Sequence, residues 1–237
     1  MDLRMLCGLD DRHIDTEQLE RPVHREVVAA WRALCADAEA AGFRPAIASG
    51  FRSHARQLTI WNEKATGRRP LLDSAGQPLD RALLDNWGVV QAILRWSALP
   101  GASRHHWGTE LDVWDRAAVP PAYQLQLTPA EVADDGPFGP FHRWLDQRIS
   151  AGQSHGFFRP YASDRGGIAP ERWHLSYAPL AAACQQALTA ERLRAVIEAS
   201  NLALREIVLA HWPEIFDRFV TVPVDSYPAP WRQQLTG

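Results

Sequence analysis

Apolar residues recur with a helical period in five segments of the chain. The first runs from Glu17 to Ala41 and is followed by Gly42, a residue type that commonly ends helices. The same spacing predicts helices over Arg52 to Ala65, Asp80 to Trp96 and Phe141 to Ser150, and a helix or helix pair over Leu180 to His211. The closing segment from Val222 to Pro230 contains three prolines and is expected to be an irregular tail.

Four shorter segments have the pattern of strands. They are Arg44 to Gly50, Glu110 to Trp114, Gly156 to Tyr161 and Trp173 to Tyr177. Successive side chains of a strand point to opposite faces, so Asp112 is expected on the same face as Glu110, and His174 on the same face as Ser176. The chain therefore has a mixed α and β order with helices at both ends.

The length of 237 residues allows one substantial core with room for a cleft. A single domain over residues 1–237 is expected, with a motif-bearing core at 42–179 and a C-terminal helical extension at 180–237. Hydrophobic residues make up 46% and charged residues 22% of the chain, which is ordinary for a globular protein. The segment 67–101 is rich in Gly, Pro and Asp at its ends and is expected to form an excursion beside the functional site.

Charge and cysteine content exclude several classes of protein. A formal net charge of -3 gives no basic field, so neither nucleic acid nor an anionic membrane surface is an expected partner. No apolar run is long enough for membrane insertion, and the first residues lack the pattern of a secretory signal. A cytoplasmic protein is expected, or a periplasmic one if a signal has been removed. Three widely spaced cysteines, Cys7, Cys35 and Cys184, are expected to be buried thiols. The oligomeric state stays open.

Two short stretches together supply two histidines, His105 and His174, and two carboxylates, Asp112 and Glu171, that are suited to one metal ion. They read S-R-H-H-W-G-T-E-L-D from Ser103 to Asp112 and E-R-W-H-L-S-Y from Glu171 to Tyr177. A catalytic zinc takes three nitrogen or oxygen ligands and leaves a position for water, and His105, Asp112 and His174 meet that count. Neither stretch resembles H-E-x-x-H, so the ligands must come from separate elements. The pairing predicts a zinc metallopeptidase.

The neighbouring residues suggest roles around the metal. Glu171 would act as general base and acid without being a ligand. Arg52 could stabilise an oxyanion or bind a substrate carboxylate, with Gln57 on nearly the same side and Ser103 adding a hydroxyl. Trp107 and Trp173 are expected to wall the cleft.

Each assignment has a plainer alternative. Arg52 alone is more often a surface ion pair, and His106 could replace His105 as a ligand, although neighbouring strand side chains face opposite ways. The other histidines are expected to be surface or packing residues: His13, His24, His54, His142, His155 and His211.

Three motifs resemble one known family. S-G-F-R-S-x-x-x-Q at Ser49 to Gln57, S-x-H-x-x-G-x-x-x-D at Ser103 to Asp112 and E-x-W-H-x-x-Y at Glu171 to Tyr177 are similar to the D-alanyl-D-alanine carboxypeptidase family of zinc peptidases. That family includes vancomycin-resistance D,D-carboxypeptidases and dipeptidases and the L,D-carboxypeptidases that trim peptidoglycan stem peptides. G-F-F-R-P-Y at Gly156 to Tyr161 resembles the carboxypeptidase branch. Tyr161 and, from the third motif, Trp173 are expected substrate contacts.

The resemblance implies an α+β fold in which a small antiparallel sheet carries the zinc, as in lysostaphin-like and hedgehog-like domains. It also implies the roles given above and a substrate that is a peptidoglycan stem peptide or muropeptide, from which a metal-activated water removes the terminal D-alanine. Two positions depart from the family pattern: Glu110 stands where a small residue, commonly Ala, is found, and Arg172 stands where Pro is common.

Other functions remain open on this resemblance. A D-alanyl-D-alanine dipeptidase or a murein endopeptidase would share the fold, and D,D against L,D specificity stays undecided. A zinc module that binds cell-wall peptides without cleaving them is a further alternative. Such a module would have no need of a base at Glu171.

Overall fold

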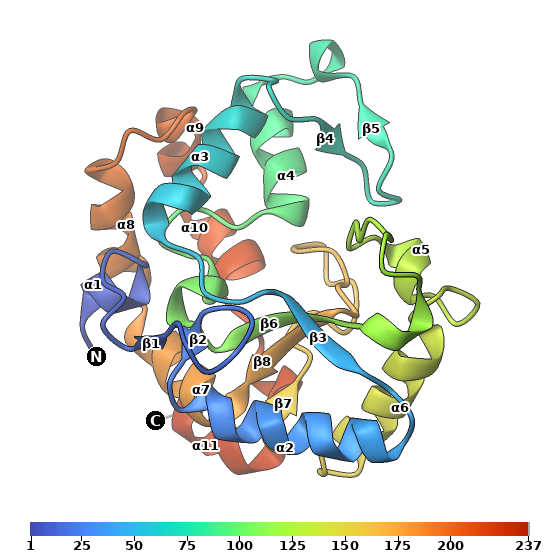
Figure 1. Cartoon of the computed structure of the whole chain (residues 1–237). Helices are drawn as coiled ribbons and strands as arrows, with labels where there is room; N and C mark the ends of the chain where they lie inside the picture. The colour runs from blue at the N-terminus through green and yellow to red at the C-terminus, as the bar shows by residue number, and fades with distance from the viewer. Residues whose placement is uncertain (237) are drawn as a thin grey trace.

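A four-stranded antiparallel sheet runs through the middle of the molecule in the computed structural model, which describes residues 1–236 (Figure 1). Its strand order is β3 (Pro45–Ser49), β6 (Glu110–Asp115), β8 (His174–Tyr177) and β7 (Phe157–Phe158). Two smaller antiparallel pairs join β1 (Ile14–Asp15) to β2 (Val23–His24) and β4 (Leu71–Leu72) to β5 (Pro78–Leu79). The predicted α+β class with a small antiparallel sheet is confirmed.

Eleven α-helices surround these strands in the described part of the chain. They are α1 (Leu3–Leu6), α2 (Val27–Ala40), α3 (His54–Ala65), α4 (Asn86–Trp96), α5 (Pro129–Val132), α6 (Gly139–Ser150), α7 (Ala178–Ala187), α8 (Ala190–Glu198), α9 (Arg205–Ala210), α10 (Trp212–Ile215) and α11 (Ala229–Thr236). In Figure 1, α2 lies along one side of the sheet, while α3, α4 and α9 lie on the other.

The alternation of side chains in β6 and β8 separates an apolar face of the sheet from a polar one. Leu111, Val113 and Leu175 are fully buried and belong to the hydrophobic cluster formed with α2 and α6. Asp112 pairs with His174 across the two strands and must therefore project to the other face. The strand period alone thus brings these two polar side chains together.

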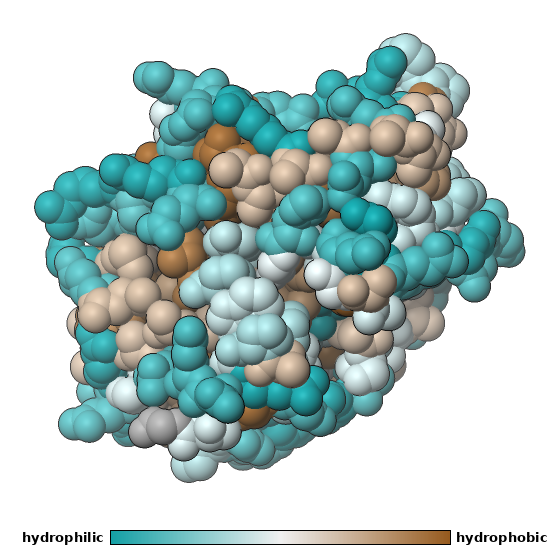
Figure 2. Space-filling view, turned by 90° about the horizontal axis from the view of Figure 1, so that it is seen from below, coloured by the Kyte–Doolittle hydropathy of each residue, from teal (hydrophilic) through white to brown (hydrophobic). Residues whose placement is uncertain are grey.

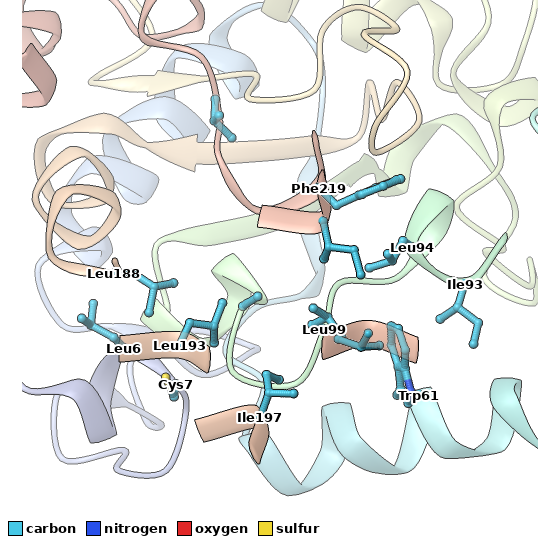
Figure 3. Close-up of a cluster of buried hydrophobic side chains, with 14 of the residues drawn as sticks. Leu6, Cys7, Trp61, Ile93, Leu94, Leu99, Leu188, Leu193, Ile197 and Phe219 are labelled. Atoms are coloured by element: carbon cyan, nitrogen blue, oxygen red, sulfur yellow. The ribbon is translucent and has the colours of Figure 1, made fainter. Parts of the chain in front are cut away.

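A second hydrophobic cluster joins the two ends of the chain. Figure 3 shows Leu6 and Cys7 close to Leu188 and Leu193, and the same cluster continues to Trp61 on α3. The helices after residue 180 are therefore packed into the same core as the N-terminal residues. Cys7 and Cys184 are buried and Cys35 is half-buried, and all three thiols are free.

Several predicted boundaries are wrong. The helix expected from Glu17 begins only at Val27, because Pro22 accepts a hydrogen bond from Phe51 and His24 donates one to Gly108. The helix expected from Asp80 begins at Asn86, where Asp85 caps it after a short 3₁₀ turn.

The C-terminal prediction needs two corrections. The segment 180–211 forms three helices rather than one or two, since Thr189 caps a new helix and Leu204 adopts a left-handed φ of 60°. The expected irregular tail contains helix α11.

Hydrophilic and apolar side chains are mixed on the surface of the molecule. The face in Figure 2 is a mosaic of hydrophilic and mildly apolar residues. Large hydrophobic side chains that are exposed among residues 1–236 are Met1, Leu9 and Leu83. No helix in this range is long and apolar enough to cross a bilayer.

Gly108, in the second motif, should be sensitive to substitution. Its φ is 70°, and an added Cβ would lie 2.5 Å from Ile14 Cδ1 and 2.6 Å from the backbone nitrogen of His24. We expect Gly108→Ala to lower the free energy of unfolding by about 1–3 kcal/mol, from strain and steric conflict. Urea denaturation would measure it. Gly42→Ala is the control, because Gly42 also has a positive φ but nothing within 4 Å of the added atom, and an equal loss in both would contradict the steric part of the argument.

Candidate active site

A cleft of about 320 Å³ lies on the polar face of the sheet. Eight of the nine predicted site residues line it: Arg52, Ser103, His105, Asp112, Tyr161, Glu171, Trp173 and His174. A larger cavity of about 680 Å³, between α6 and the C-terminal segment, contains none of them. The candidate chemistry is therefore concentrated in the smaller cleft.

His105, Asp112 and His174 form a group that could hold a metal ion. One ligand atom from each can be chosen so that all three lie within 4.8 Å of one another, and the three side chains are buried. His105 Nε2 is 3.5 Å from Asp112 Oδ2, and His174 Nδ1 is 3.2 Å from Asp112 Oδ1. These separations suit ligands that share one ion at about 2.0–2.2 Å. Asp112 Oδ1 is buried and has no hydrogen-bond partner within residues 1–236, as expected of an atom meant for a metal.

Hydrogen bonds fix which imidazole nitrogen faces the metal position. His105 Nδ1 is 2.8 Å from the carbonyl oxygen of Gly50, so it carries the proton and Nε2 is left as a ligand. His174 is turned the other way, with Nε2 2.8 Å from Glu110 Oε2 and Nδ1 toward Asp112. Each ligand histidine is therefore oriented by an acceptor on its far side.

The contacts of His106 occupy both nitrogens of its ring. Its Nδ1 lies 2.6 Å from the carbonyl oxygen of Arg52, and its Nε2 accepts from the backbone N–H of Gly101. Both ring nitrogens are thus engaged. Contrary to the prediction, His105 and His106 do not alternate on a strand, because they belong to a 3₁₀ turn, Arg104–Trp107.

Glu171 stands beside the group without belonging to it. Its Oε2 is 3.4 Å from His174 Nδ1, and its backbone N–H donates to the carbonyl of Tyr161. Burial raises the pKa of Glu171 above its usual value, an effect that the hydrogen bond with His174 partly offsets. A carboxyl group with a raised pKa next to a metal position is suited to exchanging protons.

The electrostatics of the cleft floor favour a cation. Burial disfavours a charged His174, but the nearby carboxylates of Asp112, Glu110 and Glu171 outweigh burial and raise its pKa well above the usual value. Three carboxylates converging on one imidazole thus create a place where positive charge is stabilised. A divalent metal ion held by Nδ1 would supply that charge while the ring stays neutral.

Arg52 is a guanidinium without an acidic partner. It donates to Gln57 Oε1 at 3.0 Å and to Ser49 Oγ at 3.2 Å, and within residues 1–236 it forms no ion pair with a carboxylate. The plainer prediction of a surface ion pair is therefore wrong. Burial lowers the pKa of Arg52, and the nearby Asp112 and Glu171 carboxylates oppose that shift.

Gln57 lies behind Arg52 rather than in the cleft wall. It is fully buried, and its amide donates to the carbonyl of Ala98 at 2.6 Å. Its contacts make it a support for Arg52 and for the chain before Ser103. A direct contact with substrate, as predicted, does not follow from this geometry.

Most of the remaining predicted residues line the cleft, whereas Trp107 does not. Ser103, Trp173 and Tyr161 line the cleft, and the Tyr161 ring lies 5.1 Å from the ring of His174. Trp107 is buried in the second hydrophobic cluster instead of walling the cleft, and its indole donates to the carbonyl of Leu6. None of the six other histidines lines the cleft.

Sequence reasoning missed part of the cleft wall. Lys64, Arg69 and Trp96 all line it, the last two from the excursion 67–101, which does lie beside the site. Burial lowers the pKa of Lys64 to about 8, and its ammonium group donates to Ser97 Oγ at 2.7 Å. One signal was available, because Lys64 follows Gln57 by two helical turns and so shares its face of α3.

Known proteins resemble this chain over the same region. Residues 20–180 match the family described as VanY: D-alanyl-D-alanine carboxypeptidase. An uncharacterized protein of Haemophilus influenzae is 41% identical over 99 residues, which are 40% of this chain and 68% of that protein. A D-alanyl-D-alanine carboxypeptidase of Enterococcus faecalis is 28% identical over 149 residues, 62% of this chain and 44% of its own length.

A solved structure also shows likeness. The crystal structure of a mutant vancomycin-resistance D,D-pentapeptidase, VanY, in complex with Zn(II) has a TM-score of 0.49 and 23% identity, over 84% of this chain and 92% of that one. The family match at 20–180 spans more than half of the chain and contains all three motifs. This protein therefore belongs to the VanY family of D-alanyl-D-alanine carboxypeptidases.

Proposed function

We propose that the protein is a zinc-dependent carboxypeptidase that removes the terminal D-alanine from peptidoglycan-type stem peptides. The observation that carries the proposal is the buried group of His105, Asp112 and His174, with Glu171 3.4 Å from the ring of His174, in one cleft. Family membership supports the substrate class. The set of two imidazoles and one carboxylate supports zinc as the metal.

Two imidazoles and one carboxylate suit zinc better than the common hard cations. Magnesium and calcium prefer sites made of oxygen ligands, whereas zinc accepts nitrogen and carboxylate oxygen together. Three protein ligands leave one position open, which is typical of catalytic rather than structural zinc. When bound, the ion would supply Lewis acidity that acidifies a water molecule and polarises the scissile carbonyl.

The residues around the ion would share the proton and charge transfers. Glu171 takes a proton from the attacking water and returns it to the leaving amine, so that water and peptide give a carboxylate and free D-alanine. Arg52 donates hydrogen bonds to the developing oxyanion or to the terminal carboxylate of the substrate. Gln57 and Ser49 hold the guanidinium in place for that purpose.

The charge of the cleft wall favours removal of a terminal residue over internal cleavage. Arg52, Lys64 and Arg69 bring three cationic groups into one cleft. Arg69 is paired with Glu63, but Arg52 and Lys64 contact neutral groups. A substrate that ends in a carboxylate would be attracted to this wall, while an internal peptide bond offers no such charge.

Mass analysis of purified muropeptides tests the reaction. Incubation with zinc-loaded protein should lower the mass of a stem peptide by that of one alanine residue. Removal of the zinc by a chelator should stop the reaction. Release of the intact dipeptide would favour the dipeptidase alternative, and cleavage of cross-linked muropeptides the endopeptidase. Binding without any mass change would favour the non-catalytic module and contradict the proposal.

Replacing Arg52 with lysine should separate an active-site role from a structural one. Lysine keeps the charge but cannot reproduce the planar fork, so kcat/KM should fall by roughly two to three orders of magnitude. Zinc content and melting temperature should change little. Arg56→Lys is the matched control, because Arg56 is exposed on α3 and lies outside the cleft wall. Near-parental rates for Arg52→Lys on short acyl-D-Ala-D-Ala peptides and on tetrapeptides ending in D-alanine would remove Arg52 from the site.

A further inference from the structure

A carboxylate that departs from the family pattern contacts one of the candidate ligands. Glu110 is fully buried, and its Oε2 lies 2.8 Å from Nε2 of His174. Its other oxygen, Oε1, accepts from Ser176 at 2.7 Å and from Thr109 at 2.9 Å. This side chain thus has hydrogen bonds at both oxygens, and it contacts the candidate ligand His174 through the Nε2 atom of the imidazole.

Arg104 balances the charge of Glu110. Its Nη2 is 3.4 Å from Glu110 Oε1 and donates to Ser176 Oγ at 2.8 Å, and the arginine is itself only 3% exposed. A buried carboxylate and a buried guanidinium are each costly to remove from water unless they are paired. The pair therefore keeps an ionised carboxylate in place against the far side of His174.

The pair is connected to residues beyond position 180, where the family match ends. Arg104 Nη1 donates to Gln185 Oε1 at 3.1 Å and to the hydroxyl of Tyr227 at 3.0 Å. Gln185 belongs to α7, and its amide donates to the carbonyl of Val222. Tyr227 is fully buried and precedes α11. A continuous set of polar contacts therefore runs from the C-terminal segment to His174.

We propose that Glu110 is a positioning residue for the metal site, and that Arg104, Gln185 and Tyr227 hold it there. By accepting from Nε2–H, the Glu110 carboxylate fixes the ring orientation in which the lone pair of Nδ1 is directed at the metal position. Carboxylates that contact the far nitrogen of a ligand histidine commonly contribute 10- to 100-fold to metal affinity. This inference rests on the proposed zinc function, and it makes the C-terminal segment a part of the active site's support.

Zinc affinity, measured by competition with a chelator on folded protein, tests the proposal. Glu110→Gln should weaken zinc binding by about 10- to 100-fold, since the amide is a poorer acceptor and carries no charge. A purely structural role would lower the melting temperature and leave zinc affinity unchanged. Glu131→Gln is the matched control, because Glu131 is also buried and hydrogen-bonded, but to Tyr123 and the backbone of 126–128. Zinc affinity should not change in that control.

A double variant covers the case in which Glu110→Gln fails to fold. Glu110→Gln combined with Arg104→Met removes both buried charges, a change that proteins often tolerate. Its zinc affinity should still fall by about 10- to 100-fold, and parental affinity would overturn the role of Glu110. Tyr227→Phe should give a smaller loss, and no loss would overturn the role of the C-terminal segment. A parent protein that cleaves its substrate without binding zinc would overturn the proposed function as well as this inference.

Discussion

Replacing Glu171 with glutamine should leave zinc in the protein while lowering kcat by about two to four orders of magnitude. Glutamine has the shape of glutamate and keeps a hydrogen-bonding oxygen, but it cannot take a proton from water. Zinc should stay, because Glu171 lies outside the group of three residues whose ligand atoms converge. Single-turnover rates on a D-alanine-terminated peptide, measured together with zinc content per chain, provide the test.

Two results would contradict this assignment of Glu171. If the variant loses zinc, Glu171 is a ligand and the three-ligand scheme is wrong. If the variant keeps zinc and parental kcat, proton transfer occurs elsewhere. Glu191→Gln is a suitable control, since Glu191 is exposed in the first turn of α8 and should change neither quantity.

The proximity of Asp112, Glu171 and His174 follows from short patterns within two strands and from the pairing of those strands. Asp112 and His174 each lie on a short strand, and the strand period decides which face they share. Glu171 lies three residues before His174 and is joined to it by a backbone hydrogen bond from the His174 N–H. Nothing in this arrangement depends on the rest of the chain beyond the pairing of β6 with β8.

Features that depend on distant backbone contacts could not be predicted. The apolar spacing around Val23 is helical, yet the chain there is held by Gly108 and Phe51, which lie far along the sequence. Tertiary hydrogen bonds of this kind override local propensity. The 3₁₀ turn that contains His105 is short and carries no sequence signal of its own.

The residues that support the candidate ligand His174 could not be predicted for a related reason. Glu110 was visible as a departure from a motif and as a residue on the same strand face as Asp112. Gln185 and Tyr227, which contact its partner Arg104, lie much later in the chain. Buried ion pairs are specified by three-dimensional packing rather than by spacing. The sequence could identify the candidate ligands but not the residues that orient them.

Removing both candidate histidine ligands should abolish zinc binding and activity together. Structural sites with four ligands bind zinc with a free energy of roughly 10–16 kcal/mol. Each ligand then contributes roughly 2.5–4 kcal/mol, which corresponds to about two to three orders of magnitude in affinity. His105→Ala with His174→Ala should then weaken zinc binding by about four to six orders of magnitude. Without the ion, no Lewis acid acidifies the attacking water or polarises the carbonyl, so turnover should be undetectable.

His106→Ala is the informative control for the double variant. His106 is adjacent to His105 and equally buried from solvent, but its nitrogens contact the Arg52 carbonyl and the Gly101 N–H instead of the metal position. Its removal leaves those backbone groups unpaired, so it should lower the melting temperature while the protein still takes up about one zinc per chain. Elemental analysis and chelator competition would measure both proteins side by side. Full zinc content in His105→Ala/His174→Ala, or zinc loss confined to His106→Ala, would show that the ligands have been assigned to the wrong histidines.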